Sequence, residues 1–88
     1  MLPNMMKIKE PVLKILNKRY EPSTMVETTF GRYNLSFKTD AEGRPILLFM
    51  GQKDESGNIK GERYARRLKI SPMGEVIKDH WEHKGKAT

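Results

Sequence analysis

The sequence contains no cysteine and only one tryptophan in its 88 residues. Without cysteine the chain has no disulfide, no thiolate nucleophile and no cysteine-containing zinc site. A domain of this length buries only about 60–65 % of the surface of its unfolded chain, so its stability depends on packing or on self-association. We therefore expect one small domain, spanning residues 1–88, that is stabilised by forming oligomers.

Long apolar runs are also absent. The longest uninterrupted run covers residues 46–50, whereas a helix needs roughly 20 apolar residues to cross a bilayer. The first ten residues include Lys7, Lys9 and Glu10 instead of the apolar stretch of a secretory signal. We expect no membrane association and a cytoplasmic location.

The spacing of the polar residues matches no catalytic or cofactor-binding motif. Four serines lie in turn or strand contexts, and no histidine is spaced to serve as a base for any of them. The glycines follow predicted turns and do not form a G-x-G-x-x-G or Walker pattern. We predict that the protein is not an enzyme and uses no cofactor.

The densest group of polar side chains is the segment Asp-His-Trp-Glu-His at residues 79–83. Side chains alternate along a strand, so His80 and Glu82 share one face and His83 points to the other with Trp81. Two histidines on opposite faces do not close one metal site without ligands from elsewhere. We predict no metal site here.

One amphipathic helix is predicted near the N-terminus. Val12, Leu13 and Leu16 recur at helical spacing, Pro11 suits the first turn, and Pro22 ends the segment. The predicted helix covers residues 10–21 and follows a flexible leader at residues 1–9.

Three four-residue phrases, at positions 40–43, 54–57 and 71–74, begin with Asp or Ser and end with Gly. In such turns the first side chain bonds to the backbone, and glycine accepts the left-handed conformation at the fourth position. The segments between the turns have strand composition. We predict an α+β fold in which the helix precedes a four-stranded antiparallel β-meander over residues 25–83, twisted and able to curl towards a barrel, with strands at 26–39, 44–53, 59–70 and 75–83 and a basic tail at 84–88.

The turns also predict the pairing of the strands. If Asp40 faces Arg44, and the other two turns follow the same rule, a continuous row of side chains crosses one face of the sheet. A bulge near Gly61 or at residues 31–32 would shift this register by one and invert the faces. The predicted row is Phe37, Leu47, Ala65 and Trp81.

The strand at 46–50 is apolar on both faces, so both faces of the sheet need a cover. One helix can cover one face of the sheet. The second face must be covered by curling of the sheet, by the N-terminal segment or by a second copy of the chain. We predict a homodimer, or another protein–protein contact, through a surface formed by Ile46, Leu48, Tyr64, Arg66, Leu68 and His80.

Binding of single-stranded nucleic acid is the alternative prediction. The formal charge is +6, which favours acidic partners. One predicted strand interleaves cations with an aromatic ring, a composition that suits phosphates and bases. The candidate contacts are Arg63, Tyr64, Arg66, Arg67 and Lys69.

Overall fold

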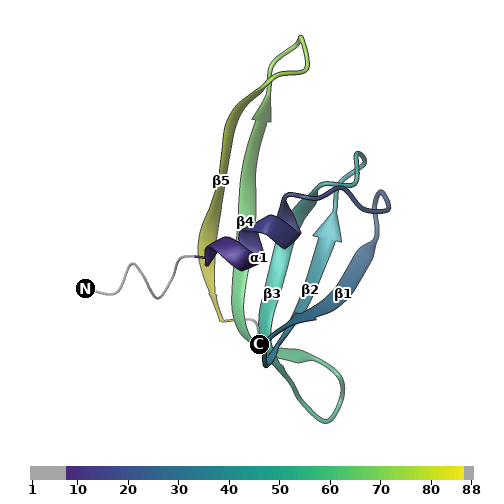
Figure 1. Ribbon diagram of the computed structural model, residues 1–88, viewed down its shortest axis with the longest axis vertical. Helices are drawn as coiled ribbons and strands as arrows, with labels where there is room; N and C mark the ends of the chain where they lie inside the picture. The colour runs from purple at the N-terminus through teal and green to yellow at the C-terminus, as the bar shows by residue number, and fades with distance from the viewer. Residues whose placement is uncertain (1–7, 87–88) are drawn as a thin grey trace, which may run out of the picture.

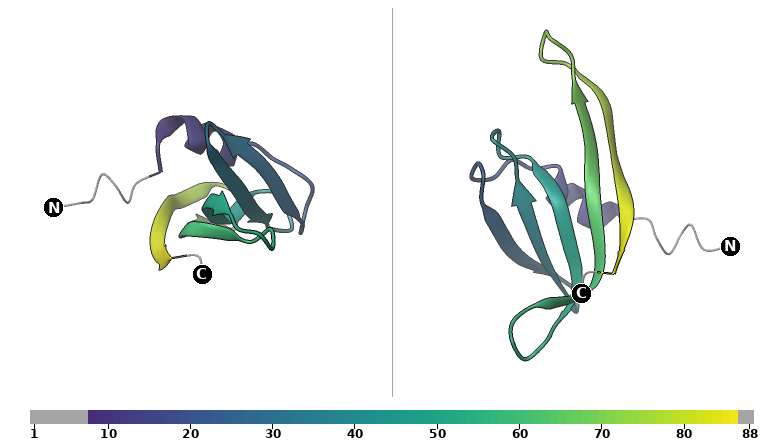
Figure 2. Two further views of the ribbon diagram at one scale, coloured as in Figure 1. Left: turned by 90° about the horizontal axis from the view of Figure 1, so that it is seen from below. Right: turned by 180° about the vertical axis from the view of Figure 1, so that it is seen from behind.

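The protein is mainly β, with one short N-terminal helix packed on a five-stranded antiparallel sheet (Figure 1). The computed structural model describes residues 8–86. Each strand pairs with the next one along the chain, so the sheet is a meander in the order β1-β2-β3-β4-β5. The sheet is curved but not closed into a barrel (Figure 2). The elements are α1 Glu10–Leu16, β1 Met25–Phe30, β2 Tyr33–Thr39, β3 Pro45–Lys53, β4 Ile59–Ile70 and β5 Val76–Lys86.

The helix followed by an antiparallel meander is as predicted, but the strand number is five and not four. The segment predicted as one strand at 26–39 is a hairpin in which Phe30 pairs with Tyr33. Gly31, between them, has a φ of 60°. A positive φ at the first position of a two-residue loop reverses the chain in a tight hairpin, so this glycine marks a turn where we predicted continuous strand or a bulge.

The helix is shorter than predicted and ends at Leu16. Tyr20, which has helical spacing in the sequence, is held elsewhere: its backbone N–H donates to the carbonyl of Gly43 at 2.8 Å, and its hydroxyl donates to the carbonyl of Ile15 at 2.7 Å. The chain after Leu16 is therefore pulled onto the β2–β3 turn instead of extending the helix to residue 21.

All three predicted turns form, and each is capped by its first side chain. The first residue accepts hydrogen bonds from the backbone N–H groups two and four residues later, at 2.8–3.2 Å. The glycine in fourth place has a φ between 83° and 89° in each turn. The first residues are Asp40, Asp54 and Ser71, and the glycines are Gly43, Gly57 and Gly74.

The middle turn gives the predicted register, with Leu47 opposite Ala65, but the two outer turns do not. Immediately after the first turn, Ile46 is an extra residue without a partner on β2. Pro45, just before it, has no N–H to give to the ladder, and Thr39 opposite donates its N–H to the carbonyl of Thr24 at 2.9 Å. This β-bulge moves the β2–β3 pairing by one residue.

The same shift follows the last turn, where Ile77 is the extra residue between the Ile70↔Val76 and Lys69↔Lys78 pairs. The predicted row was therefore wrong, because a one-residue slip moves each side chain to the other face. The observed row is Phe37, Leu48, Tyr64 and His83.

The core lies between α1 and one face of the sheet, which we call the helix side. Val12 and Leu16 of the helix are 2 % and 0 % exposed, and the ring of Tyr20 packs edge-on against Phe37 with centroids 5.0 Å apart. Ile8, predicted as part of the flexible leader, is also buried, and the rest of that leader, residues 1–7, lies outside the described residues. The buried apolar residues are Ile8, Val12, Leu16, Leu35, Phe37, Leu48 and Tyr64.

The opposite face, which we call the open side, carries Leu47, Phe49 and Ala65, all of them half-buried. Part of its cover comes from the tip of the β3–β4 hairpin. Lys53 in this hairpin forms an ion pair of 3.1 Å with Glu27 on β1, although β2 lies between their strands. The sheet thus curls over its own open side. Curling of the sheet is one of the three ways of covering the second face that we considered from the sequence.

The outer hairpin extends beyond the other strands as an arm, residues 66–80 (Figure 1). The pairing of β3 with β4 ends at the Leu47↔Ala65 pair, so from residue 66 onward β4 pairs with β5 alone within the described chain. At the other end, β5 continues through residues 84–86, which we predicted as a tail. The arm is the part of the fold with least support from neighbouring strands.

Candidate interaction surface

The structure does not bring the six predicted interface residues together. Leu48 and Tyr64 are 0 % and 2 % exposed and belong to the core beneath α1. Ile46 is half-buried at the bulge. Leu68 and His80 lie on opposite sides of the arm, since Leu68 pairs with Asp79 and the side chains alternate. The shift at Ile46 places Leu48 beside Phe37, so α1 covers the face that was predicted as the interface. The shift at Ile77 moves His80 to the other face.

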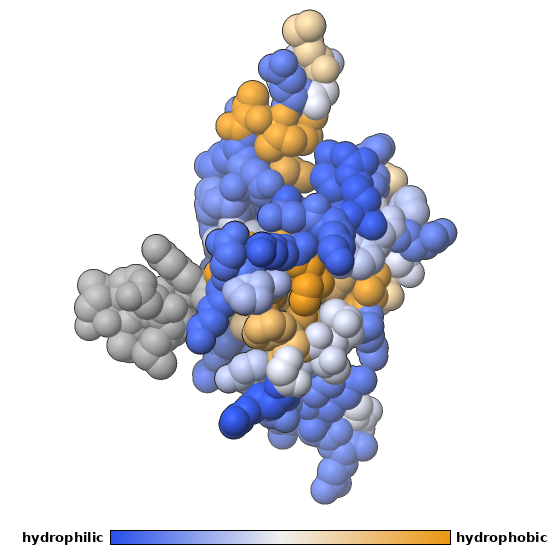
Figure 3. Space-filling model, viewed as in Figure 1, coloured by the Kyte–Doolittle hydropathy of each residue, from blue (hydrophilic) through white to orange (hydrophobic). Residues whose placement is uncertain are grey.

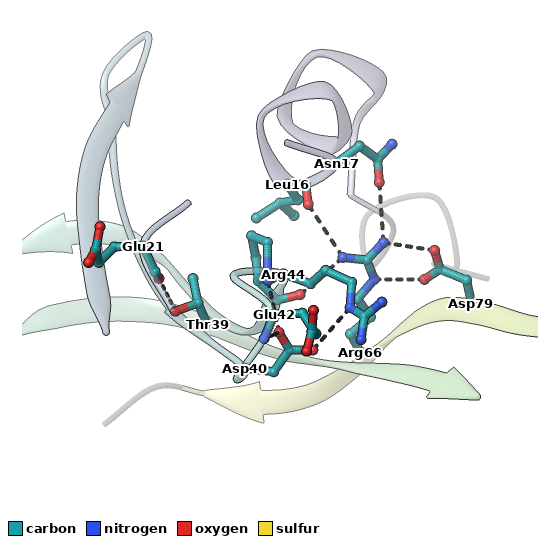
Figure 4. A network of polar contacts seen from close by, with 10 residues as sticks. Leu16, Asn17, Glu21, Thr39, Asp40, Glu42, Arg44, Arg66 and Asp79 are labelled. Carbon is teal, nitrogen blue, oxygen red and sulfur yellow. Dashed lines mark hydrogen bonds and ion pairs between the residues drawn. The ribbon is translucent and has the colours of Figure 1, made fainter. Parts of the chain in front are cut away.

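Arg66, predicted as an interface and nucleic-acid residue, is instead the centre of a polar network (Figure 4). Its side chain is only 7 % exposed. Nη1 donates to the carbonyls of Pro45 at 3.1 Å and Leu16 at 3.4 Å, and Nη2 donates to Oδ1 of Asn17 at 3.4 Å. Arg66 therefore joins the end of the helix to β3, and it is not available as a contact for a partner.

Asp79 on β5 completes this network. Nε and Nη2 of Arg66 each donate to its carboxylate at 2.7 Å, and the guanidinium also lies 5.7 Å from the centroid of the Trp81 ring. These hydrogen bonds from Arg66 hold the pKa of Asp79 below its ordinary value. Arg67, the next residue on β4, pairs with His80.

The arm carries exposed apolar side chains. Val76 and Ile77 are 52 % and 58 % exposed, and Met73 at the tip is 90 % exposed. Leu68 and Ile70 are half-buried on the same hairpin. In the space-filling view these apolar atoms gather on the arm beyond the helix (Figure 3). The bulge at Ile77 places two apolar residues side by side here, and spacing alone did not reveal it.

The outer edge of β5 is the longest free strand edge in the described part of the chain, since β5 pairs with β4 and with no other strand there. Its sequence from Lys78 to Lys84 reads Lys-Asp-His-Trp-Glu-His-Lys. Trp81 is the centre of this segment. His80 and Glu82 are each one residue from Trp81, and Asp79 and His83 are each two residues from it. Charged side chains protect many natural strand edges from pairing, but in an antiparallel pair about Trp81 the acidic residues here stand opposite histidines, and only Lys78 meets a like charge, Lys84.

Basic residues occupy the open side of the same hairpin. Arg63, Arg67 and Lys69 are exposed there, and Lys69 stands directly opposite Lys78. Like charges in direct cross-strand positions destabilise a sheet. Arg67 lies 3.7 Å from a carboxylate oxygen of Glu82. Three of the five predicted nucleic-acid contacts thus share one exposed face, while Tyr64 and Arg66 lie on the helix side.

The two histidines lie on opposite sides of β5, as strand alternation predicts. His80 hydrogen-bonds Glu82 at 3.1 Å, whereas His83 hydrogen-bonds Glu62 and packs edge-on against Tyr64 with centroids 5.3 Å apart. The hydrogen bond to His83 holds the pKa of Glu62 below its ordinary value. Across residues 8–86 no three histidine or acidic side chains are grouped so as to hold a metal ion.

Comparisons with known proteins add no family to this geometry: no family model, no curated protein and no solved structure matches the chain. In the described residues, no helix has the length and apolar character required to span a membrane.

Proposed function

We propose that the protein is a non-enzymatic module that works by associating with a second copy of itself through its outer strand, β5. The observation that carries this proposal is the pair of exposed apolar residues, Val76 and Ile77, beside a strand edge that has no partner in the described chain. Unpaired edge strands readily template pairing with another chain, and covering apolar surface adds a favourable free energy.

The order of polar residues on β5 supports an antiparallel pairing of two copies about Trp81. In this register Asp79 stands opposite His83 of the second copy, and His80 stands opposite Glu82, whereas Lys78 stands opposite Lys84 and opposes the pairing. Each acid–histidine pair becomes an ion pair when the histidine is protonated, and cross-strand pairs of opposite charge stabilise a sheet by roughly 0.2–1 kcal/mol each. Ile77 comes opposite Gly85, which has no side chain to obstruct it. A two-fold axis at Trp81 makes the contact closed, so it predicts a dimer and not a fibre.

Engineered cysteines test this register, because the natural chain has no cysteine to interfere. Directly opposed strand residues have Cα atoms about 4.5–5.5 Å apart, within the range of a disulfide. We expect a mixture of the His80→Cys and Glu82→Cys proteins, one of them carrying an affinity tag, to form a disulfide between unlike chains. Thr28→Cys on the opposite edge strand, mixed with either, is the control.

Light scattering on the natural protein tests self-association independently of the strand register. A concentration-dependent dimer without the cross-link retains self-association but rejects pairing about Trp81. A monomer at all micromolar concentrations rejects the proposed function itself.

Binding of single-stranded nucleic acid remains the second candidate, supported by the exposed Arg63, Arg67 and Lys69 and by the like-charge pair of Lys69 and Lys78. A phosphate backbone at this face relieves the repulsion between the two lysines. Binding through phosphate contacts weakens steeply as salt rises, because counterions are released. We expect labelled oligonucleotides to show this salt dependence, and the double variant Lys69→Gln/Lys78→Gln to reduce its slope. Absent or salt-independent binding rejects this candidate.

A further inference from the structure

A cavity of about 430 Å³ opens on the helix side of the sheet, between the start of α1 and the ends of the strands. It is separate from β5 and from the proposed dimer contact. Its walls come from five elements: Val12 of α1, Phe30 of β1, Tyr33 of β2, Met50 of β3 and Tyr64 of β4. Its volume falls within the range of roughly 300–1,000 Å³ that is usual for small-molecule sites. The size and the apolar walls suit a small apolar ligand.

Gly51 and Gly61 form part of the cavity wall, where β3 and β4 lie close together. These two residues are directly opposed on β3 and β4, and both line the cavity. A Cβ atom at Gly51 would lie 2.0 Å from the carbonyl oxygen of Lys60, and one at Gly61 would lie 2.1 Å from that of Met50. Both contacts are with the backbone of the neighbouring strand, so the pairing of the two strands in this wall requires glycine at both positions.

The polar side chains that line the cavity are two lysines, one carboxylate, one amide and two tyrosine hydroxyls. Lys9 and Lys60 line it, both are exposed, and neither forms an ion pair within residues 8–86. The one carboxylate, Glu62, is already bonded to His83 and lies 3.2 Å from Lys86. Burial raises the pKa of the Tyr64 hydroxyl, and the charge of Glu62 raises it further, so this group remains a hydrogen-bond donor at neutral pH.

We propose that this cavity binds a small apolar monocarboxylate, with its hydrocarbon part against Val12, Phe30 and Met50 and its carboxylate at the mouth between Lys9 and Lys60. Two ammonium groups beside one neutralised carboxylate favour an anion over a cation or a neutral molecule. The apolar walls require the hydrocarbon part, because a bare inorganic anion gains nothing from them.

Calorimetry with octanoate, octanol and octylamine as probes tests the proposal. We expect octanoate to bind more tightly than octanol, and octylamine to bind least tightly. Lys60→Gln and Lys9→Gln should each weaken octanoate roughly 2–5-fold, the range for an exposed ion pair, and leave octanol unchanged. Lys38→Gln is the matched control, since it removes the same charge from an exposed position on the open side of β2, away from the cavity. Met50→Ala should weaken octanoate and octanol alike.

Three outcomes overturn the proposal. These are no binding of octanoate, equal affinity for octanoate and octylamine, and binding that neither lysine variant changes. Loss of octanoate binding in Val76→Lys/Ile77→Lys, with Lys60→Gln unaffected, places the ligand on the exposed arm and also rejects the cavity. A circular dichroism spectrum of each variant confirms that the fold is intact. The result is independent of the proposed dimer, because none of the cavity residues belongs to β5.

Discussion

Arg66 donates two hydrogen bonds of 2.7 Å to the carboxylate of Asp79 across the base of the arm. The same guanidinium bonds to the carbonyls of Leu16 and Pro45. One side chain thereby fixes three things at once: the end of the helix, the start of β3 and the position of β5. The arm is held at its base by this network, since β3 does not pair with β4 beyond Ala65.

Removing Asp79 is predicted to destabilise the fold. Asp79→Ala leaves the nearly buried guanidinium of Arg66 without its counter-charge, and we expect a loss of about 1–3 kcal/mol, because hydrogen bonds to charged groups are among the stronger ones. Arg67→Ala removes a cation from the exposed side of the same strand and should change stability by less than about 0.5 kcal/mol. Urea denaturation of both variants measures the difference, and equal losses contradict the role of the network.

The stabilisation by Asp79 should depend on pH in a defined direction. Its folded-state pKa is lowered by the hydrogen bonds from Arg66, so its contribution is fully present above the unfolded value of about 3.9 and is lost as the pH falls through the folded pKa. We expect the difference in unfolding free energy between the natural protein and Asp79→Asn to be constant from neutral pH down to about 5 and to shrink below about 4. In an Arg66→Met background this pH dependence should disappear.

Local turn chemistry was sufficient to predict a helix followed by an antiparallel meander. It did not predict the fifth strand or the pairing of the outer strands. The turns that begin at Asp40, Asp54 and Ser71 formed as predicted because each is determined by a side chain and a glycine within five residues. The bulge at Ile46 follows Pro45 and is accompanied by the bond from Thr39 to Thr24 in a distant segment. The bulge at Ile77 lies within its own hairpin, and its sequence carries no comparable signal.

The candidate surface failed for the same physical reason. The shift at Ile46 puts Leu48, and with it the correctly paired Tyr64, beside Phe37 in the core and not at an interface. The cavity was not predictable either, because it joins side chains from α1, β1, β2, β3 and β4. The alternation of His80 and His83 was correct, because it depends on strand geometry and not on pairing.

Thr39 is predicted to stabilise the first bulge through its hydroxyl. The side chain is 2 % exposed; Oγ1 donates to the carbonyl of Glu21 at 2.7 Å and accepts from the N–H of Thr24 at 2.9 Å. Thr39→Val keeps the shape but removes both bonds, and we expect a loss of about 1–3 kcal/mol. Thr39→Ser keeps the hydroxyl and should lose only about 0.8 kcal/mol for the missing methyl group. Thermal and urea unfolding compare the two, and a larger loss for serine contradicts the assignment.

Charges placed on the exposed arm should separate the proposed dimer. In Val76→Lys/Ile77→Lys two exposed apolar residues become cations beside the edge of β5, and we expect light scattering to report a monomer at concentrations where the natural protein is a dimer. Met25→Lys is the matched control, because Met25 is 51 % exposed on the opposite edge strand. The far-ultraviolet spectrum should remain unchanged in both variants. Dissociation by Met25→Lys but not by the arm variant assigns the contact to β1 and rejects the proposal for β5.

Gly43 and Gly74 occupy the same position of equivalent turns, so alanine substitution at each separates backbone strain from steric contact. Their φ angles are 83° and 89°, and the strain of alanine at a positive φ, about 1–2 kcal/mol, is common to both. A Cβ at Gly74 meets nothing within 4 Å, whereas one at Gly43 lies 2.2 Å from the carbonyl oxygen of Tyr20, the residue that bonds to this turn. We expect Gly74→Ala to cost about the strain alone and Gly43→Ala to cost at least about 1 kcal/mol more, with disruption of the Tyr20 contact. Amide hydrogen exchange at Tyr20 then distinguishes the two, since protection should fall in Gly43→Ala and persist in Gly74→Ala.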